Sequence, residues 1–446
     1  MCGIDFSHIL MRRLRESDIG KLEIFFVRNN RPEVTYFFTH FPLTEQTARA
    51  ILKLIVKDSF FVLENADRFL AFSMLRDQAE GYDIPNFGIF VDWEYRNYGL
   101  GRQLSEWTFR WADQLGMPEI RLSVYEENKQ AVSLYQRLGF HESHRKEDNN
   151  GRISLIMNRK RQKVSTNVFA STQALTSDEA LTDRLNQWFD AGIHHIELSN
   201  CLIESEDTFL KEAALFPGKL LIHHFFPANP KNVILNLASI DPIRRQSTRL
   251  FFQRSLEWSA KIGAPSFSFH AGYITDPVGT DKHGFILEEP TTRSYDAAWD
   301  LFTAEVEILR KTASQYGVTL LIENNVVSKR NEKKLLLAKP EEFERFFNQP
   351  SINENIGILL DWGHWLVTAK TYHLDLDSFL PLSDRICGIH LHSNDGIEDE
   401  HHPLREDCSY IDILQSFKPA FVSLEGHYGS IGHLQHDILK MGKAFS

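Results

Sequence analysis

Eight short apolar runs recur between residues 165 and 446, and most of them end in a histidine or a carboxylate. Segments with helical spacing, such as 243–262 and 295–316, separate the runs. This alternation is typical of parallel strands whose connections are helices. Eight strand–helix units in about 280 residues predict a (β/α)₈ barrel, whose polar strand ends meet at one mouth. The runs are Val168–Ala170, His195–Leu198, Lys219–His223, Ser266–His270, Val318–Glu323, Gly357–Asp361, Ile386–His392 and Phe421–Glu425.

The strand-end residues are of the types that bind divalent cations. Carboxylates mixed with imidazoles suit such ions, and four of them fall on successive predicted strands. We therefore expect a metal site in the barrel. His270, Asp399 and His401 are further candidate ligands, although the stretch that carries the last two, Glu398–His402, also reads as a solvated loop. Glu197, at the end of the second run, is interpreted as a structural residue or a substrate contact.

Charge is distributed unevenly along the 446 residues. Residues 1–163 hold 24 basic and 22 acidic side chains, whereas the remainder holds 25 and 38, with 15 of the 19 histidines. An acidic, histidine-rich region disfavours nucleic-acid binding, which depends on neutralising phosphates with basic groups. No apolar stretch is long enough to span a membrane. Four scattered cysteines, and a start (Met1–His8) without the order of a secretory signal, predict a cytoplasmic protein.

The first third of the chain has a different pattern. Strand-like runs at 59–63, 69–75 and 87–91 precede the segment Arg96-x-x-Gly99-x-Gly101, which opens a helical pattern. Glycines between a strand and a helix let backbone amides approach an anion, so this segment predicts a phosphate cradle. Taken alone, it reads equally well as a simple glycine-rich turn before a helix. The polar, basic stretch 158–167 marks a boundary, giving domains of 1–160 and 161–446.

A second motif strengthens the first. After the strand-like run 120–124 comes Asn128-x-x-Ala131-x-x-Leu134-Tyr135-x-x-x-Gly139-Phe140. Together the two blocks resemble the GNAT acyltransferase superfamily over about residues 9–160. The resemblance implies a fold with a mixed central sheet and acetyl-CoA as the cofactor.

The resemblance also implies roles for single residues of this front domain. Backbone amides after Val91, and those around Arg96, Gly99 and Gly101, would hold the pyrophosphate of acetyl-CoA. Asn128 would contact the pantetheine arm, and Tyr135 would protonate the departing thiolate, unless it is only a core aromatic. The general base is open, because Asp92 and Glu94 read equally well as solvated loop charges.

The barrel segment resembles the xylose-isomerase-like barrel superfamily over nearly all of residues 165–446. Its sugar-converting members imply one divalent cation, Mn²⁺, Co²⁺, Mg²⁺ or Zn²⁺, bound by Glu323, Asp361, His392 and Glu425. Glu323 and Glu425 would also act as acid and base, and His364 would contact a substrate oxygen.

Other members of this superfamily, the metal-dependent apurinic endonucleases, use nine ligands for three metals. The chain has a residue of suitable type for each, so phosphodiester cleavage stays open. These residues are His223, His270, Glu323, Asp361, His364, His392, Asp399, His401 and Glu425.

The resulting hypothesis is a bifunctional enzyme of sugar metabolism. The barrel would isomerise or epimerise a sugar, and the front domain would acylate an amine, as in the making of acylated amino sugars for surface polysaccharide. The alternatives are an acyltransferase with a non-catalytic barrel as binding module, and a barrel that cleaves phosphate esters. The expected partners are a small sugar and an acceptor amine, without nucleic acid or membrane; homo-oligomerisation is left open.

Overall fold

A computed structural model describes residues 9–445 of the chain, apart from short gaps. Contacts divide the chain into two compact units. The first comprises residues 1–163, 187–194 and 430–439, and the second comprises 164–186, 195–429 and 440–446. The start of the chain, Cys2, Cys408 and part of the stretch proposed as the domain boundary lie outside the described residues. The gaps are 56–57, 67, 77–80, 82, 163–166, 176–178, 229–233, 282–283, 288–293, 353 and 408.

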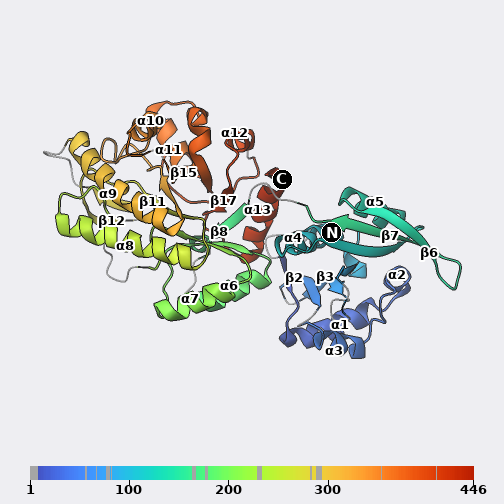
Figure 1. Ribbon diagram of the computed structural model, residues 1–446. Helices are drawn as coiled ribbons and strands as arrows, with labels where there is room; N and C mark the ends of the chain where they lie inside the picture. The colour runs from blue at the N-terminus through green and yellow to red at the C-terminus, as the bar shows by residue number, and fades with distance from the viewer. Residues whose placement is uncertain are drawn as a thin grey trace. The chain divides into compact units, whose positions relative to one another are not determined.

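The first unit contains a mixed seven-stranded sheet (Figure 1), with strand order β1-β2-β3-β4-β5-β7-β6. Neighbouring strands are antiparallel except β4 and β5, which are parallel. The strands are β1 (Ile9–Arg13), β2 (Ser59–Asn65), β3 (Arg68–Arg76), β4 (Asn86–Val91), β5 (Glu119–Tyr125), β6 (His141–Glu147) and β7 (Ile153–Lys160). The helices are α1 (Ile19–Asn29), α2 (Pro32–Thr35), α3 (Glu45–Leu52), α4 (Leu100–Gln114) and α5 (Lys129–Arg137), with 3-10 turns η2 (Glu16–Asp18) and η4 (Trp93–Tyr95).

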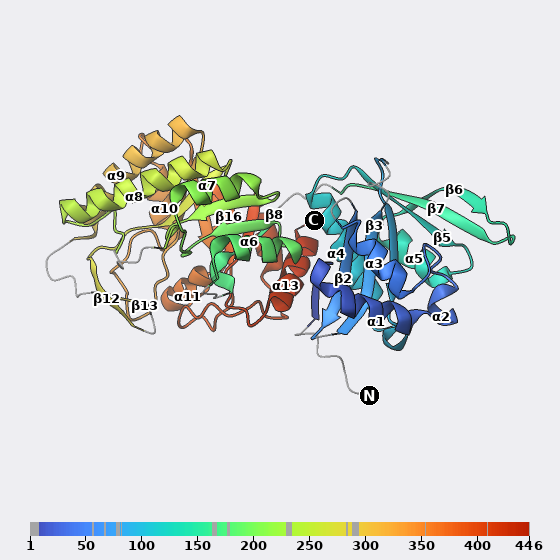
Figure 2. The same ribbon diagram turned by 90° about the horizontal axis from the view of Figure 1, so that it is seen from below.

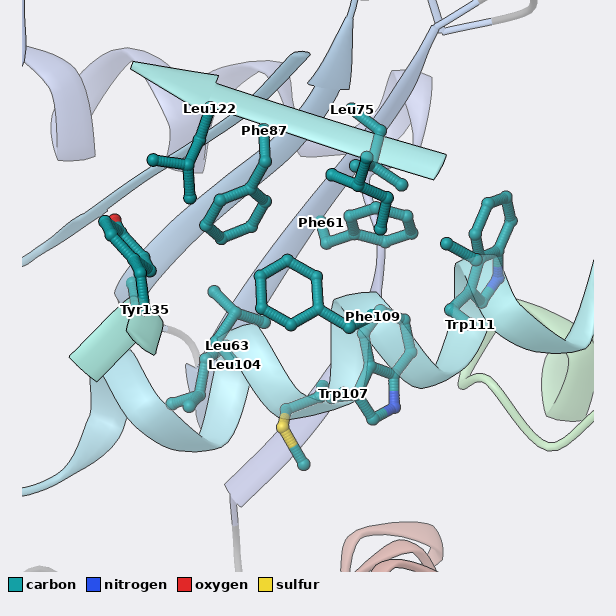
Figure 3. Close-up of a cluster of buried hydrophobic side chains, with 14 of the residues drawn as sticks. Phe61, Leu63, Leu75, Phe87, Leu104, Trp107, Phe109, Trp111, Leu122 and Tyr135 are labelled. Carbon is teal, nitrogen blue, oxygen red and sulfur yellow. The ribbon is translucent and has the colours of Figure 1, made fainter. Parts of the chain in front are cut away.

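The sheet of the first unit has a hydrophobic core on each face. One core joins strand residues such as Phe61 and Phe87 to Leu104 and Phe109 of α4 (Figure 3). The other joins Phe72 and neighbouring strand residues to α1, α2 and α3. Full burial of an aromatic side chain of this kind stabilises a fold by roughly 1.5–3 kcal/mol relative to exposure. The two cores fix the positions of the strands between them. They thereby also fix the position of the turn that follows β4.

The second unit is a closed barrel of eight parallel strands in the order β10-β11-β14-β15-β16-β17-β8-β9. The strands are β8 (Asn167–Ser171), β9 (His195–Leu198), β10 (Lys219–His223), β11 (Ser266–His270), β14 (Thr319–Glu323), β15 (Ile356–Asp361), β16 (Ile386–Leu391) and β17 (Phe421–Leu424). A separate hairpin joins β12 (Pro277–Asp281) to β13 (Gly284–Leu287).

Along the chain, a helix follows each barrel strand. Figure 2 labels several of these helices beside the barrel strands β8 and β16. The helices are α6 (Leu181–Asp190), α7 (Glu206–Leu215), α8 (Pro242–Lys261), α9 (Tyr295–Tyr316), α10 (Pro340–Phe347), α11 (Trp362–Tyr372), α12 (Ile411–Ser416) and α13 (Ile431–Ala444), with 3-10 turns η5 (Thr172–Ala174) and η6 (Leu380–Arg385). Inside the barrel, Phe169, Leu321 and Phe421 belong to one buried apolar cluster. Packed side chains therefore fill the barrel, which leaves chemistry to the strand ends.

The predicted fold class, a mixed-sheet domain followed by a (β/α)₈ barrel, is confirmed. All eight barrel strands occur at the predicted runs. Four strands were not predicted: β1 and β6 of the first unit, and β12 and β13, which form the hairpin. Among the described residues, no helix is both long enough and apolar enough to cross a membrane.

Candidate functional site

Four polar side chains gather at the carboxyl ends of four neighbouring barrel strands. Glu323 ends β14, Asp361 ends β15, His390 lies in β16, and Glu425 follows β17. All four are buried, and each offers one ligand atom within 4.8 Å of the ligand atoms of the others. Nδ1 of His390 lies 3.1 Å from Oε2 of Glu425, 3.5 Å from Oε1 of Glu323 and 3.8 Å from Oδ2 of Asp361. We call these four residues the first ligand group.

The histidine of this group differs from the one expected from sequence. His392 was predicted to join Glu323, Asp361 and Glu425, whereas the structure brings His390 to them. Side chains two residues apart along an extended chain point to the same side, so both histidines face the barrel interior. They differ in depth: Nε2 of His392 contacts Oδ1 of Asp361 at 3.2 Å and Oδ1 of Asp399 at 3.5 Å. His392 therefore lies nearer the loops.

A second ligand group consists of His364, His392, Asp399 and His401. Oδ2 of Asp399 lies 3.3 Å from Nε2 of His364 and 3.1 Å from Nε2 of His401. The stretch that carries Asp399 and His401 is held by two backbone hydrogen bonds between Ser393 and His402, each 2.8 Å. Asp399 thus points at His364, while the His401 ring stacks on that of His392 with the centroids 3.9 Å apart. Both side chains are only partly exposed, so the alternative of a solvated loop does not describe them.

A third ligand group is formed by His223, His270 and Glu323. Oε2 of Glu323 lies 3.4 Å from Nε2 of His223 and 3.4 Å from Nδ1 of His270. Its other oxygen faces the first group, so Glu323 belongs to both. The nine positions that sequence assigned to three metals fall within these groups, with His390 as an addition.

The polar atoms of the first group fit a cation. Both oxygens of Glu323, Oδ2 of Asp361, Nδ1 of His390 and Oε1 of Glu425 are buried, and none has a hydrogen-bond partner among the described residues. Burying such groups without partners is unfavourable by several kcal/mol, and a divalent ion would satisfy all of them. Oxygen and imidazole donors suit Mn²⁺, Co²⁺, Mg²⁺ or Zn²⁺.

Nearby histidines favour the ionised form of two carboxylates of the site, Asp399 and Glu425. Burial opposes ionisation, but His401 and His364 hold the pKa of Asp399 well below its ordinary value. His390 does the same for Glu425. Burial alone would lower the pKa of His390, but nearby carboxylates raise it well above its ordinary value. Negative and positive charges therefore alternate across the site.

Backbone contacts orient the ligand residues. The Asp361 N–H donates to Oδ1 of Asn324 at 2.7 Å, and the Asn324 amide donates to the Asp361 carbonyl at 3.0 Å. Nδ1 of His364 donates to the Asn324 carbonyl at 2.9 Å. A Cβ at Gly363 would lie 2.0 Å from the His392 ring, so the close approach of helix α11 requires glycine there. Neither Asn324 nor Gly363 was singled out from sequence, because neither carries ligand chemistry.

In the first unit, the predicted phosphate cradle follows β4, which pairs with β5 over only part of its length. The pairing of β4 with β5 covers Asn86 with Arg121 and Phe87 with Leu122. The chain beyond Val91 makes the turn η4 and enters α4 at Leu100, where the first amide N–H groups have no helical partner. Gly99 has φ +80°, which favours glycine. A Cβ at Gly101 would lie 3.3 Å from Val91 Cγ2.

The other predicted residues of the first unit have structural contacts. Arg96 donates to the Glu33 carbonyl. Asn128 caps α5 by accepting from the Ala131 N–H at 3.3 Å. Asp92 is fully buried and contacts Arg28 and Arg68, while Glu94 contacts Arg68. Asp92 and Glu94 were the two candidates for the general base in the sequence analysis, and both carboxylates form ion pairs with arginines.

Tyr135 lies at the edge of the core shown in Figure 3. Its ring centroid is 6.1 Å from that of Phe87 and 5.9 Å from that of Phe140. Burial raises the pKa of its phenol far above the ordinary value, so the hydroxyl keeps its proton. The side chain is therefore a core aromatic whose buried hydroxyl stays protonated.

Comparison with known proteins gives two family matches. Residues 190–437 match the family described as xylose isomerase-like TIM barrel, and residues 26–140 match the acetyltransferase (GNAT) family. The first match covers more than half of the chain.

Individual relatives are distant. An uncharacterized protein of Sinorhizobium fredii is 24% identical over 246 residues, which are 50% of this chain and 72% of that protein. The solved structure of a D-tagatose 3-epimerase-like protein is 18% identical and covers 62% of this chain and 97% of its own, with a TM-score of 0.47. A GNAT-family acetyltransferase from Streptococcus pneumoniae is 22% identical and covers 34% of this chain and 99% of its own, with a TM-score of 0.31.

Proposed function

Because this chain belongs to the xylose isomerase-like TIM barrel family and carries a GNAT acetyltransferase region before the barrel, we propose that it is a bifunctional enzyme. The barrel isomerises or epimerises a sugar in a metal-dependent reaction, and the first unit transfers an acetyl group from acetyl-CoA to an amine. The observation that carries the proposal is the buried first ligand group, Glu323, Asp361, His390 and Glu425, with its unsatisfied polar atoms.

In this proposal, two carboxylates of the first ligand group transfer protons. When bound, a divalent cation would polarise neighbouring substrate oxygens and acidify the adjacent carbon. Glu323 and Glu425 come from different strands, and one would take the proton from that carbon while the other returns a proton. Return to the opposite face of the same carbon gives an epimer, and return to the neighbouring carbon gives an isomer. His364 would contact a substrate oxygen.

The acetyltransferase half uses the turn after β4. Amides from Val91 to Gly101 and the amino-terminal end of α4 favour an anion, which in this proposal is the pyrophosphate of acetyl-CoA. Asn128 would contact the pantetheine arm. Tyr135, whose hydroxyl keeps its proton, would donate it to the departing thiolate. The acceptor amine belongs to the same or a neighbouring sugar intermediate, as in the synthesis of acylated amino sugars.

Two cysteines, Cys201 and Cys387, are free thiols. They fit a reducing compartment, and we propose a cytoplasmic location. No nucleic-acid partner is part of the proposal.

The barrel reaction is tested by hydrogen exchange. We expect the protein loaded with Mn²⁺ or Co²⁺ to introduce solvent deuterium beside the carbonyl of at least one aldose or ketose in D₂O, detected by NMR. A carboxylate that has taken a proton from carbon exchanges it with solvent before returning it. Chelation should abolish the exchange, and added metal should restore it. A metal-loaded protein that exchanges no hydrogen in any sugar contradicts the proposal and favours a barrel that serves as a binding module.

The three ligand groups favour a second candidate, the hydrolysis of a phosphate ester. Glu323 is shared by the first and third groups, and Asp361 contacts His392 of the second, so several cations would lie close together. Neighbouring cations stabilise both the attacking and the leaving oxygen of a displacement at phosphorus. If the chain binds two or three ions and cleaves bis-p-nitrophenyl phosphate, phosphate-ester hydrolysis is the reaction of the barrel, and the proposed sugar reaction is wrong.

The acetyltransferase half gives a further prediction, Tyr135→Phe. We expect this variant to lower kcat for acetyl transfer by roughly 10- to 100-fold while the Kd of CoA changes little, because only the donated proton is lost. The ring and its contacts with Phe87 and Phe140 remain, so the thermal midpoint should stay within a few degrees. An unchanged kcat would leave Tyr135 as a core aromatic alone.

A further inference from the structure

Glu197 is a charged residue in the interior of the barrel. It lies in β9, where its Cα pairs with Leu221 of β10 and Ser171 of β8. Its exposure is 0%, although the interiors of such barrels are filled mainly by branched apolar side chains. Burying a carboxylate is strongly unfavourable unless a partner compensates it, so the partner of Glu197 has to be identified.

That partner is His390. Oε2 of Glu197 lies 2.8 Å from Nε2 of His390, which is also fully buried. Within the described part of the chain this is the only ion pair that Glu197 makes. Since β9 and β16 are separated by β8 and β17 in the strand order, the contact crosses the barrel interior.

The His390 ring thereby joins Glu197 to the first ligand group. One nitrogen, Nε2, faces Glu197. The other, Nδ1, faces Glu425 at 3.1 Å and Glu323 at 3.5 Å. A histidine that binds a metal is a neutral imidazole with one N–H and one lone pair, so in the metal-bound state an acceptor at Nε2 places the lone pair at Nδ1.

We propose that Glu197 is a positioning residue for the metal centre. Its carboxylate lies 2.8 Å from Nε2 of His390 as an ion pair, and neither group makes a hydrogen bond within the described residues. In the metal-bound state it would accept the Nε2–H and thereby present the Nδ1 lone pair to the ion. This inference rests on the metal centre of the proposed function and adds a residue beyond the ligand groups. A carboxylate behind a ligand histidine fixes the ring and increases its basicity, and loss of such a group typically weakens metal binding 10- to 100-fold.

The test measures metal affinity in the full-length chain. Wild type, Glu197→Gln and Glu305→Gln are stripped of metal and titrated with Co²⁺ against a chromogenic chelator. We expect Glu197→Gln to bind Co²⁺ about 10- to 100-fold more weakly and with an altered visible absorption spectrum. Glu305→Gln is the matched control, because Glu305 is also a buried carboxylate of the barrel unit but contacts Arg245 at 3.2 Å and Arg249 at 2.8 Å. It is expected to bind Co²⁺ as wild type does.

The outcomes separate this inference from the proposed function. If wild type takes up no Co²⁺, the metal centre and the inference are both overturned. If wild type binds Co²⁺ and Glu197→Gln binds it equally well, only the inference is overturned. The ligand atoms of Glu197, His223 and His390 also lie within 4.8 Å of one another. If the Glu197→Gln variant loses one whole ion while the remaining ions bind unchanged, Glu197 is a direct ligand of a separate ion in that group. That result too overturns the positioning role.

A measurement on wild type alone covers the case in which Glu197→Gln does not fold. In Zn²⁺-loaded protein labelled with ¹⁵N at histidine, we expect Nε2 of His390 to carry the proton and Nδ1 to show the shift of a metal-bound nitrogen. A metal-bound Nε2 with a protonated Nδ1 overturns the inference without any variant.

Discussion

Replacing Glu323 by glutamine is expected to remove the bound metal and the barrel activity together. Oε1 of Glu323 faces His390 at 3.5 Å, and Oε2 faces His223 and His270 at 3.4 Å, so one substitution removes a negative charge from two ligand groups. The proposed acid–base role is lost as well. We expect kcat for hydrogen exchange to fall roughly 1,000-fold, within the range usual for loss of a general acid or base. Elemental analysis should find fewer ions per chain.

Two controls accompany the Glu323→Gln variant. Glu305→Gln removes a buried glutamate that pairs with arginines, and should retain both the metal and the exchange activity. Acetyl transfer by the first unit should continue in the Glu323→Gln chain, which shows that the variant is folded. A Glu323→Gln protein with its full complement of ions and normal exchange would exclude Glu323 as a ligand and as an acid or base.

A second prediction concerns His390 and His392, whose substitution should affect different bound ions. We expect His390→Gln to weaken binding of the ion in the first group by at least about 100-fold, because it removes a direct ligand and not only its support. His392→Gln should leave that ion in place and weaken an ion in the second group instead. Both side chains have an exposure of 0%, so the two variants lose equally buried rings.

Titration of both variants with Co²⁺, combined with ion counts at saturation, gives the comparison. Thermal unfolding of the metal-free proteins controls for damage to the barrel, and both midpoints should fall to a similar extent. If His392→Gln weakens binding of the tightest ion more than His390→Gln does, His392 is the histidine ligand of the first group.

Much of the fold was predictable because the barrel strands are buried and short. Runs such as Val318–Glu323 are apolar at nearly every position and end in a polar residue, and burial on both faces produces that pattern. Strand β6 lacks it: all seven residues of His141–Glu147 are exposed, and the strand exists through pairing with β7. Pairing of this kind leaves little trace in the sequence of the strand itself.

The site was predictable in chemistry and less so in detail. Residue types at strand ends indicated metal ligands, but alternation along a strand cannot distinguish His390 from His392, which point to the same side. Only the distances to Glu425 and Asp399 separate them: Nδ1 of His390 lies 3.1 Å from Glu425, whereas Nε2 of His392 lies 3.5 Å from Asp399. The ion pairs of Asp92 depend on Arg28 and Arg68, which are distant in sequence, so the burial of Asp92 could not be inferred from its own neighbourhood.

The closure of the barrel has a consequence for how the protein unfolds. Strand β17 completes the ring by pairing with β8, from Phe421 with Asn167 to Leu424 with Ala170. Glu425 directly follows β17, and Glu197 approaches His390 from the strand beyond β8. The ligand geometry is therefore non-local and cannot exist in a partly assembled ring. An ion bound to these ligands would oppose the separation of β17 from β8, the last and first strands of the barrel. Metal binding and the cooperative unfolding of the whole barrel are therefore thermodynamically linked.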